Sequence, residues 1–169
     1  MKISLISTSH RKNSQSNRIR EILDSSLKSK RNNIKTFNLD FSKEMPPIWS
    51  SEKQQKMGFW GKKWDKISNE LKSSDGFIFV VPEYGGMATP NAKNFFLICG
   101  EGELSHKPGL LVSISSGNGG AYPISELRSS SYKNTHIMWI PENIIIRNVG
   151  QFSPGKHGEL IPEWLDSRI

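Results

Sequence analysis

Three short stretches of this 169-residue sequence carry functional groups that could bind a phosphorylated, flat ligand. The first stretch supplies hydroxyls, amides and one guanidinium, and a predicted helix follows it. These groups and the free N–H groups of a helix N-terminus are what a phosphate needs. The stretch is neither a Walker P-loop nor a G-x-G-x-x-G loop, so helix capping by Ser14 or Ser16 is an equal alternative. Its sequence is Ser7-Thr8-Ser9-His10-Arg11-Lys12-Asn13-Ser14-Gln15-Ser16-Asn17.

The second and third stretches are rich in glycine, which lets a backbone approach a flat ligand closely. Each follows an apolar run that is typical of a buried strand. Taken singly, the second is also compatible with a tight turn in which Tyr84 packs on its neighbours, and the third with a flexible connection. All three together favour a ligand site. The two sequences are Pro82-Glu83-Tyr84-Gly85-Gly86 and Ser115-Ser116-Gly117-Asn118-Gly119-Gly120.

The hydrophobic pattern predicts strands that alternate with helices. Pro82 cannot donate to a ladder and is expected to end the third strand. Pro90 suits the first turn of a helix. We expect strands at residues 3–6, 33–39, 76–81, 110–115 and 135–140, with 144–146 extending or following the last strand. Apolar residues share one helical face around residues 19–27, 60–71 and 92–96, and around 124–127 in a shorter helix.

Short connections between alternating strands and helices indicate an α/β protein with a doubly wound parallel sheet. Five strands fit the flavodoxin-like order 2-1-3-4-5, in which the first, third and fourth strands are neighbours. The three stretches follow these strands and would meet at one edge of the sheet, where open α/β sheets bind ligands. We expect one domain over residues 1–169. After residue 154 there is room only for a shortened C-terminal helix.

Composition narrows the classes of function. The single cysteine, Cys99, allows no disulfide framework, and the absence of a membrane-length apolar run favours a cytoplasmic protein. Residues 1–74 contain 16 Lys and Arg against 7 Asp and Glu, whereas residues 75–169 contain 7 against 9. This excess fits either a solvated lysine-rich face or attraction of phosphates. Nucleic-acid binding is disfavoured because the basic residues are dispersed, and the four histidines lack metal-ligand spacing.

In the three stretches described above, the sequence resembles the NAD(P)H-dependent FMN reductases of flavodoxin-like fold. Thr8 replaces the usual glycine of the first family motif, and Gly85 replaces the usual asparagine of the second. The first motif, G-S-x-R-x-x-S, is matched by Ser9, Arg11 and Ser14. The second motif, P-E-Y-N-x-S/T-x-P followed by K-N, is matched by Pro82, Glu83, Tyr84, Pro90, Lys93 and Asn94. The third, a glycine-rich loop followed by L-R, is matched by Gly117, Gly119, Gly120, Leu127 and Arg128.

The resemblance implies an oxidoreductase that passes hydride from NAD(P)H through bound FMN to a small acceptor. The acceptor would be a quinone, an azo compound, a free flavin or a metal ion. The resemblance also implies that Ser9, Arg11, Ser14, Gln15, Ser16 and Asn17 hold the phosphate. Pro82, Glu83, Tyr84, Gly85 and Gly86 would line the isoalloxazine, and the third stretch, with Ser115, Gly117, Gly119 and Gly120, would close the other side. No residue is expected to act as a general acid or base.

Other classes remain open at this point. A flavodoxin-like electron carrier is possible, although such carriers are typically acidic. A nucleotide hydrolase or transferase could use Glu83 as nucleophile or base. A relative could also have lost its cofactor. If the protein is a reductase of this family, we expect a homodimer or homotetramer.

Overall fold

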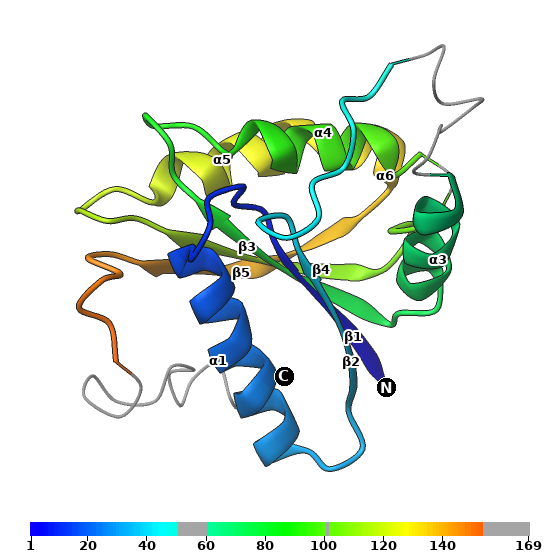
Figure 1. The fold of residues 1–169 in the computed structure, drawn as a ribbon, viewed down its shortest axis with the longest axis horizontal. Helices are drawn as coiled ribbons and strands as arrows, with labels where there is room; N and C mark the ends of the chain where they lie inside the picture. Colours follow the sequence, from blue (N-terminus) through cyan, green and yellow to red (C-terminus); the bar gives the residue numbers. More distant parts are fainter. Residues whose placement is uncertain (51–60, 101, 154–169) are drawn as a thin grey trace.

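Five parallel strands form one sheet in the order β2-β1-β3-β4-β5 (Figure 1). The computed structural model describes residues 1–50, 61–100 and 102–153. The strands are β1 (Lys2–Ser7), β2 (Lys35–Asp40), β3 (Gly76–Pro82), β4 (Pro108–Ile114) and β5 (Met138–Ile146). The predicted flavodoxin-like order is therefore confirmed.

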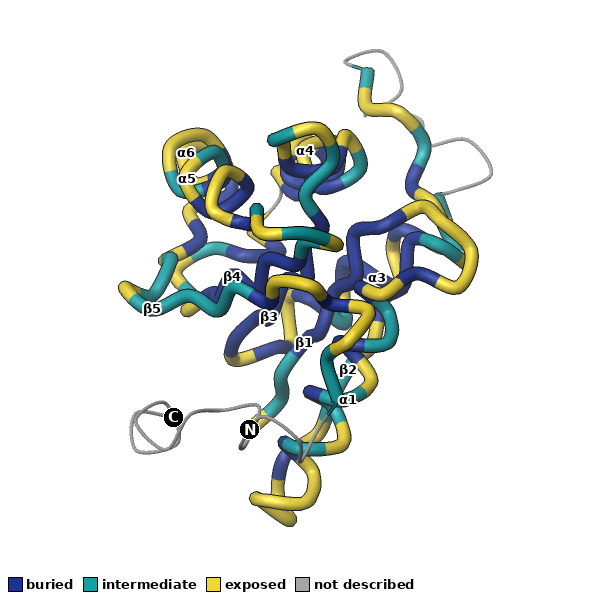
Figure 2. The backbone as a smooth tube through the Cα atoms, turned by 90° about the vertical axis from the view of Figure 1, so that its left-hand side faces the viewer, coloured by how far each residue is buried: buried dark blue, intermediate teal, exposed yellow. Residues whose placement is uncertain are grey.

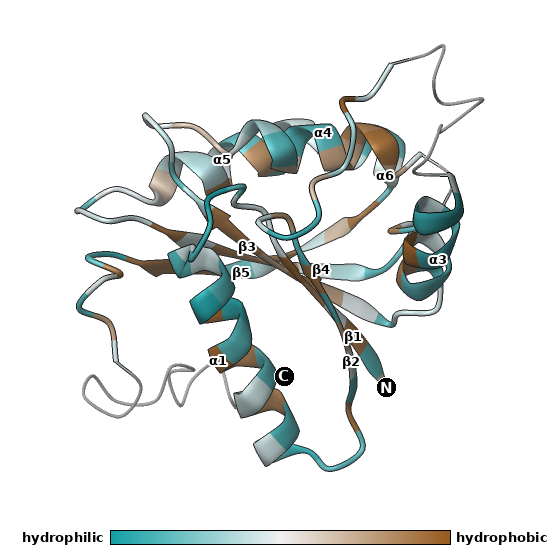
Figure 3. Cartoon of the chain, viewed as in Figure 1, coloured by the Kyte–Doolittle hydropathy of each residue, from teal (hydrophilic) through white to brown (hydrophobic). Residues whose placement is uncertain are grey.

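Helices cover both faces of this sheet (Figures 1 and 2). Helix α1 packs on one face, where Ile19 and Leu23 join Leu5 and Val80 in one apolar core. The other helices cover the opposite face around the ring of Phe79. The central strands are hydrophobic, whereas α1 and α3 are largely hydrophilic (Figure 3). The helices are α1 (Gln15–Lys30), α3 (Gly61–Lys72), α4 (Pro90–Ile98), α5 (Ala121–Ser130) and the short α6 (Tyr132–Thr135).

Strand β3 is buried along its whole length, as the apolar run predicts. It extends one residue beyond the predicted end, because Pro82 pairs with Ile114 of β4. The pairing of β3 with β1 already ends at Val80. The missing N–H of Pro82 therefore costs the sheet no hydrogen bond with β1. The next residue continues the ladder, since the amide of Glu83 donates to the carbonyl of Ile114 at 2.9 Å.

Strand β5 differs most from the sequence prediction. It runs over Met138–Ile146, whereas Thr135 belongs to α6. Between its pairs with Gly109 and Leu111 of β4 the register shifts, and β5 bulges. One guanidinium nitrogen of Arg128 donates to three successive carbonyls in the bulge, those of Ile140, Pro141 and Glu142. The contacts of Arg128, which lies in α5, therefore stabilise β5 at the point where its apolar sequence pattern is interrupted.

One prediction, the shortened C-terminal helix after residue 154, lies outside the described residues. Among the helices that the structure describes, none has the length and apolar character needed to cross a membrane.

Candidate functional site

Three loops meet at the carboxyl edge of the sheet, on the left in Figure 1. We call them the first loop (residues 8–14, after β1), the second loop (residues 83–89, after β3) and the third loop (residues 115–120, after β4). Contacts of Tyr84 and Glu83, described below, join the second loop to the first and to the third. The predicted juxtaposition of the three stretches is thus present in the structure.

The first loop leads into the capped N-terminus of α1. The Ser14 hydroxyl accepts the amide of Asn17 at 3.1 Å and caps the helix. The amides of Gln15 and Ser16 lie in the first turn, where helix geometry provides no intrahelical acceptor. The Ser16 hydroxyl is buried and has no hydrogen-bond partner among the described residues. This helix end therefore offers backbone and hydroxyl groups to an anion.

Two of the predicted phosphate ligands use their side chains within the helix. The Gln15 side chain accepts from Arg18 at 2.6 Å. The Asn17 side chain donates to Glu21 at 2.9 Å and accepts from Arg20 at 2.9 Å. Both residues stand at the predicted edge, but only the backbone amide of Gln15 is left for a phosphate, because the amide of Asn17 donates to the Ser14 hydroxyl.

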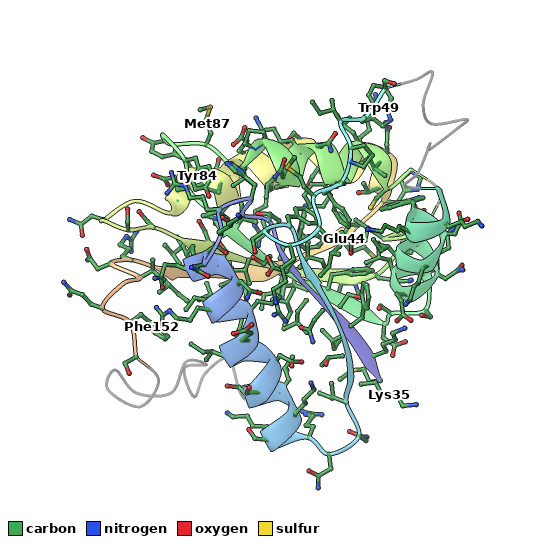
Figure 4. The ribbon with its side chains drawn as sticks, viewed as in Figure 1. Lys35, Glu44, Trp49, Tyr84, Met87 and Phe152 are labelled. Atoms are coloured by element: carbon green, nitrogen blue, oxygen red, sulfur yellow. The ribbon has the colours of Figure 1, made fainter. Side chains whose placement is uncertain are left out.

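Tyr84 of the second loop joins the first loop (Figure 4). Its hydroxyl lies 2.8 Å from the Ser9 hydroxyl. The guanidinium carbon of Arg11 lies 4.5 Å from the centre of the Tyr84 ring, which is a cation–π contact. The Ser9 hydroxyl also accepts the amide of Arg11 at 3.2 Å. Tyr84 thus contacts two of the residues that were predicted to hold a phosphate.

The second loop turns tightly at its two glycines. The amide of Tyr84 donates to the carbonyl of Met87 at 2.9 Å, and the reverse bond measures 3.1 Å. Gly85 has φ of 60° and Gly86 has φ of 78°. Positive φ at both central positions is the requirement of a type I′ turn, which favours Asn-Gly or Gly-Gly. The glycines are therefore needed for the turn itself, in addition to leaving space for a ligand.

This geometry predicts that Gly85→Asn stabilises the protein. Asparagine tolerates positive φ, and a Cβ at this position would meet only the end of Met87, at 3.9 Å. Because the substitution restricts the unfolded chain, the free energy of unfolding should rise by about 0.4–1 kcal/mol. Urea unfolding measures the change. Gly85→Ala is the control and should destabilise instead, and equal effects of the two substitutions would contradict the prediction.

The third loop is held by Glu83. The amide of Gly120 donates to Oε2 of Glu83 at 2.6 Å. A Cβ added to Gly119 would overlap Oε1 of the same carboxylate, so a side chain there would displace the carboxylate from this position. Within the loop, the Ser115 hydroxyl accepts the amide of Gly117 at 3.3 Å. The carboxylate of Glu83 is thus bound to backbone, which weakens the alternative in which it attacks a substrate.

Lys93 and Asn94, which match the second family motif but lie outside the three loops, make contacts that hold neighbouring segments together. Lys93 pairs with Glu126 of α5. Asn94 donates to the carbonyl of Pro47 at 2.9 Å and accepts the amide of Trp49 at 2.7 Å. Sequence reasoning missed Glu126, which also accepts the amide of Ala88 at 2.6 Å. Only its position six residues after Gly120 on a predicted helix could have suggested it.

The Glu126 carboxyl gives a pH prediction. Burial raises its pKa, but the hydrogen bonds from Lys93 and Ala88 and the charge of Lys93 outweigh burial and lower the pKa below 4.5. A carboxyl whose pKa is lower in the folded state than in the unfolded state stabilises the protein when the pH is above the pKa of the unfolded state. This stabilisation is lost as the pH falls through the pKa of the folded state. The stability advantage of the wild type over Glu126→Gln should therefore be full at pH 7 and shrink below pH 4.5. Urea unfolding at pH 7, 5 and 3.5 checks this, and a constant difference would contradict it.

The chain belongs to the NADPH-dependent FMN reductase family, whose sequence model matches residues 1–151. The protein is therefore an NAD(P)H-dependent oxidoreductase that uses FMN. The groups at the loops fit this cofactor, since a capped helix N-terminus with a buried, unpartnered Ser16 hydroxyl suits a phosphate. A comparison with curated protein sequences finds no match.

Solved structures with the same fold are similar at low sequence identity. An oxidoreductase from Corynebacterium diphtheriae has a TM-score of 0.74 at 13% identity, with 99% of this chain and 89% of that chain covered. The flavoenzyme NAD(P)H:(acceptor) oxidoreductase FerB from Paracoccus denitrificans has a TM-score of 0.72 at 15% identity, covering 99% and 90%. An azoreductase from Bacillus anthracis has a TM-score of 0.64 at 16% identity, covering 89% and 88%. At these identities the likeness establishes the fold.

Proposed function

We propose that the three loops form the FMN site and that the enzyme transfers electrons from NAD(P)H to a small, flat acceptor. The observation that carries the proposal is the contact of Tyr84 with both Ser9 and Arg11, which joins a candidate phosphate loop to a candidate ring-binding loop. A quinone, an azo compound, a free flavin or a metal ion is the proposed acceptor.

The first loop would hold the phosphate. Arg11 supplies positive charge, and the amides of Gln15 and Ser16 point along the positive end of the α1 dipole. The hydroxyls of Ser9 and Ser16 would complete the set, Ser16 gaining the hydrogen bond that it lacks among the described residues. Ser14 and Asn17 would act indirectly, because their mutual cap keeps this helix end in place.

The second and third loops would hold the ring system. Gly85 and Gly117 have little around them, since an added Cβ would meet one atom at 3.9 Å at Gly85 and nothing within 4 Å at Gly117. Backbone at these positions can approach a flat ring closely. Bound FMN would supply the hydride-accepting and electron-donating chemistry. The protein supplies binding, orientation and an open face, and the proposal assigns no side chain a proton-transfer role.

The test is reduction by nicotinamide nucleotide without a partner protein. When NADPH or NADH is added anaerobically to purified protein reconstituted with FMN, the visible absorbance of the oxidised flavin should fall. Addition of a quinone should restore this absorbance. FMN, and no FAD, should be released on denaturation. If neither nucleotide bleaches the flavin, the electron-carrier alternative gains and the proposed reaction is wrong. If no flavin binds after reconstitution, the proposed site is wrong.

A further inference from the structure

We propose that Glu83 and Glu126 act together as positioning residues that set the distance between the second and third loops. The proposal rests on the function proposed above, because that distance would define the width of the slot for the ring system. We call the pair of bonds from these residues the carboxylate clasp: the amide of Gly120 to Glu83, and the amide of Ala88 to Glu126.

The first bond of the clasp replaces a missing helix cap. Helix α5 begins after Gly120, whose φ is 107° and which has no side chain to cap the helix. Glu83 provides the carboxylate from another element, at 2.6 Å. A negative charge at this end of the helix also interacts favourably with the helix dipole. The carboxylate of Glu83 occupies space that a side chain at position 119 would need, because a Cβ on Gly119 would overlap Oε1.

The second bond runs in the opposite direction. Glu126 lies in α5 and accepts the amide of Ala88, which follows the turn of the second loop. Lys93 of α4 pairs with the same carboxylate. A glutamate carboxyl is ionised at neutral pH. A charged acceptor makes this hydrogen bond stronger than a neutral one would be.

The two bonds hold the second loop at both ends. Glu83 stands at its start and is bound to Gly120, the residue before α5, whereas Ala88 stands near its end and is bound to Glu126 of α5. The turn from Tyr84 to Met87 projects between these two points. Since α5 is one rigid helix, loss of either bond would let the turn move relative to the third loop, and the other bond would then be strained. The clasp therefore predicts coupling between two bonds that share no residue.

Amide hydrogen exchange of the flavin-free, ¹⁵N-labelled protein tests this coupling. Glu83→Ala should speed exchange at Gly120 about tenfold or more, as expected for a lost charge-assisted hydrogen bond, and should also speed exchange at Ala88. Glu126→Ala should speed exchange at Ala88 about tenfold or more and should also speed exchange at Gly120. The double variant should be little worse than the worse single variant, because coupled residues are not additive. FMN titration should give dissociation constants raised about tenfold or more in both single variants.

Matched variants separate the clasp from general damage to the fold. Glu83→Gln and Glu126→Gln keep an acceptor oxygen and should recover part of the protection. Lys93→Met removes the ion pair but leaves the Ala88 bond, and should change FMN affinity less than Glu126→Ala does. Faster exchange only at each variant's own amide would overturn the clasp, as would unchanged FMN affinity in both alanine variants. Wild-type protein that binds no FMN would refute the proposed function, and that result is independent of the exchange data.

Discussion

Replacement of Gly120 by alanine is expected to lower the free energy of unfolding by about 2–6 kcal/mol. Two costs of about 1–3 kcal/mol each combine. The residue has φ of 107°, which an L-amino acid rarely adopts. An added Cβ would also lie 2.6 Å from Cγ2 of Ile145 in β5. Since typical stability is about 5–15 kcal/mol, this is a large fraction of the total. Urea unfolding monitored by tryptophan fluorescence gives the value.

Gly117 in the same loop is the matched control. No heavy atom lies within 4 Å of an added Cβ there, and its φ is outside the positive region. Gly117→Ala should therefore change the free energy of unfolding by less than about 1 kcal/mol. A large loss of stability in this variant, or a small loss in Gly120→Ala, would mean that the third loop can relax around a side chain.

Arg11→Ala is expected to weaken FMN binding by about tenfold to a hundredfold. This corresponds to about 1.5–3 kcal/mol, the contribution of a hydrogen bond to a charged group. The guanidinium is exposed but is held over the ring of Tyr84. A cation that is already oriented loses less side-chain entropy when it binds an anion. Titration of flavin-free protein with FMN, followed by quenching of flavin fluorescence, measures the change.

Two further variants separate charge from stacking. Lys12→Ala removes the neighbouring exposed cation and should leave the dissociation constant within about threefold, since only screened long-range attraction is lost. Arg11→Lys keeps the charge but loses the planar fork, so its affinity should fall between those of wild type and Arg11→Ala. Identical titration curves for wild type and Arg11→Ala would place Arg11 outside the site.

The sequence predicted elements well where local pattern and tertiary environment agree. The run at 76–81 is apolar because β3 is buried on both faces, and helix α4 begins at Pro90 as expected, with Thr89 as its cap. At β5 it placed the start at residue 135 in place of Met138, and it left open whether 144–146 extends the strand, because Pro141 and polar residues interrupt the apolar pattern. There the bulge and the Arg128 contacts decide the structure, and they connect residues 12–14 positions apart. No window of local periodicity contains that information.

The candidate site was predicted at the level of loops but not of contacts. Strand order alone brings the ends of β1, β3 and β4 to one edge, so the three stretches could be placed together. The partners of Tyr84, Glu83 and Glu126 could not, because these bonds join residues 37–75 positions apart. Gly119 is the residue in the sequence that relates to one of these bonds, since a side chain at this position would overlap the Glu83 carboxylate.

The bulge of β5 has a consequence for self-association. β5 is an edge strand, and a regular edge offers a row of backbone donors and acceptors on which a strand of another molecule can add. Pro141 has no amide hydrogen, and Arg128 occupies the carbonyls of Ile140, Pro141 and Glu142. The middle of this edge is therefore unsuited to pairing. The irregularity therefore disfavours the addition of a strand of another molecule along the middle of β5, whereas β2 forms the other edge of the sheet.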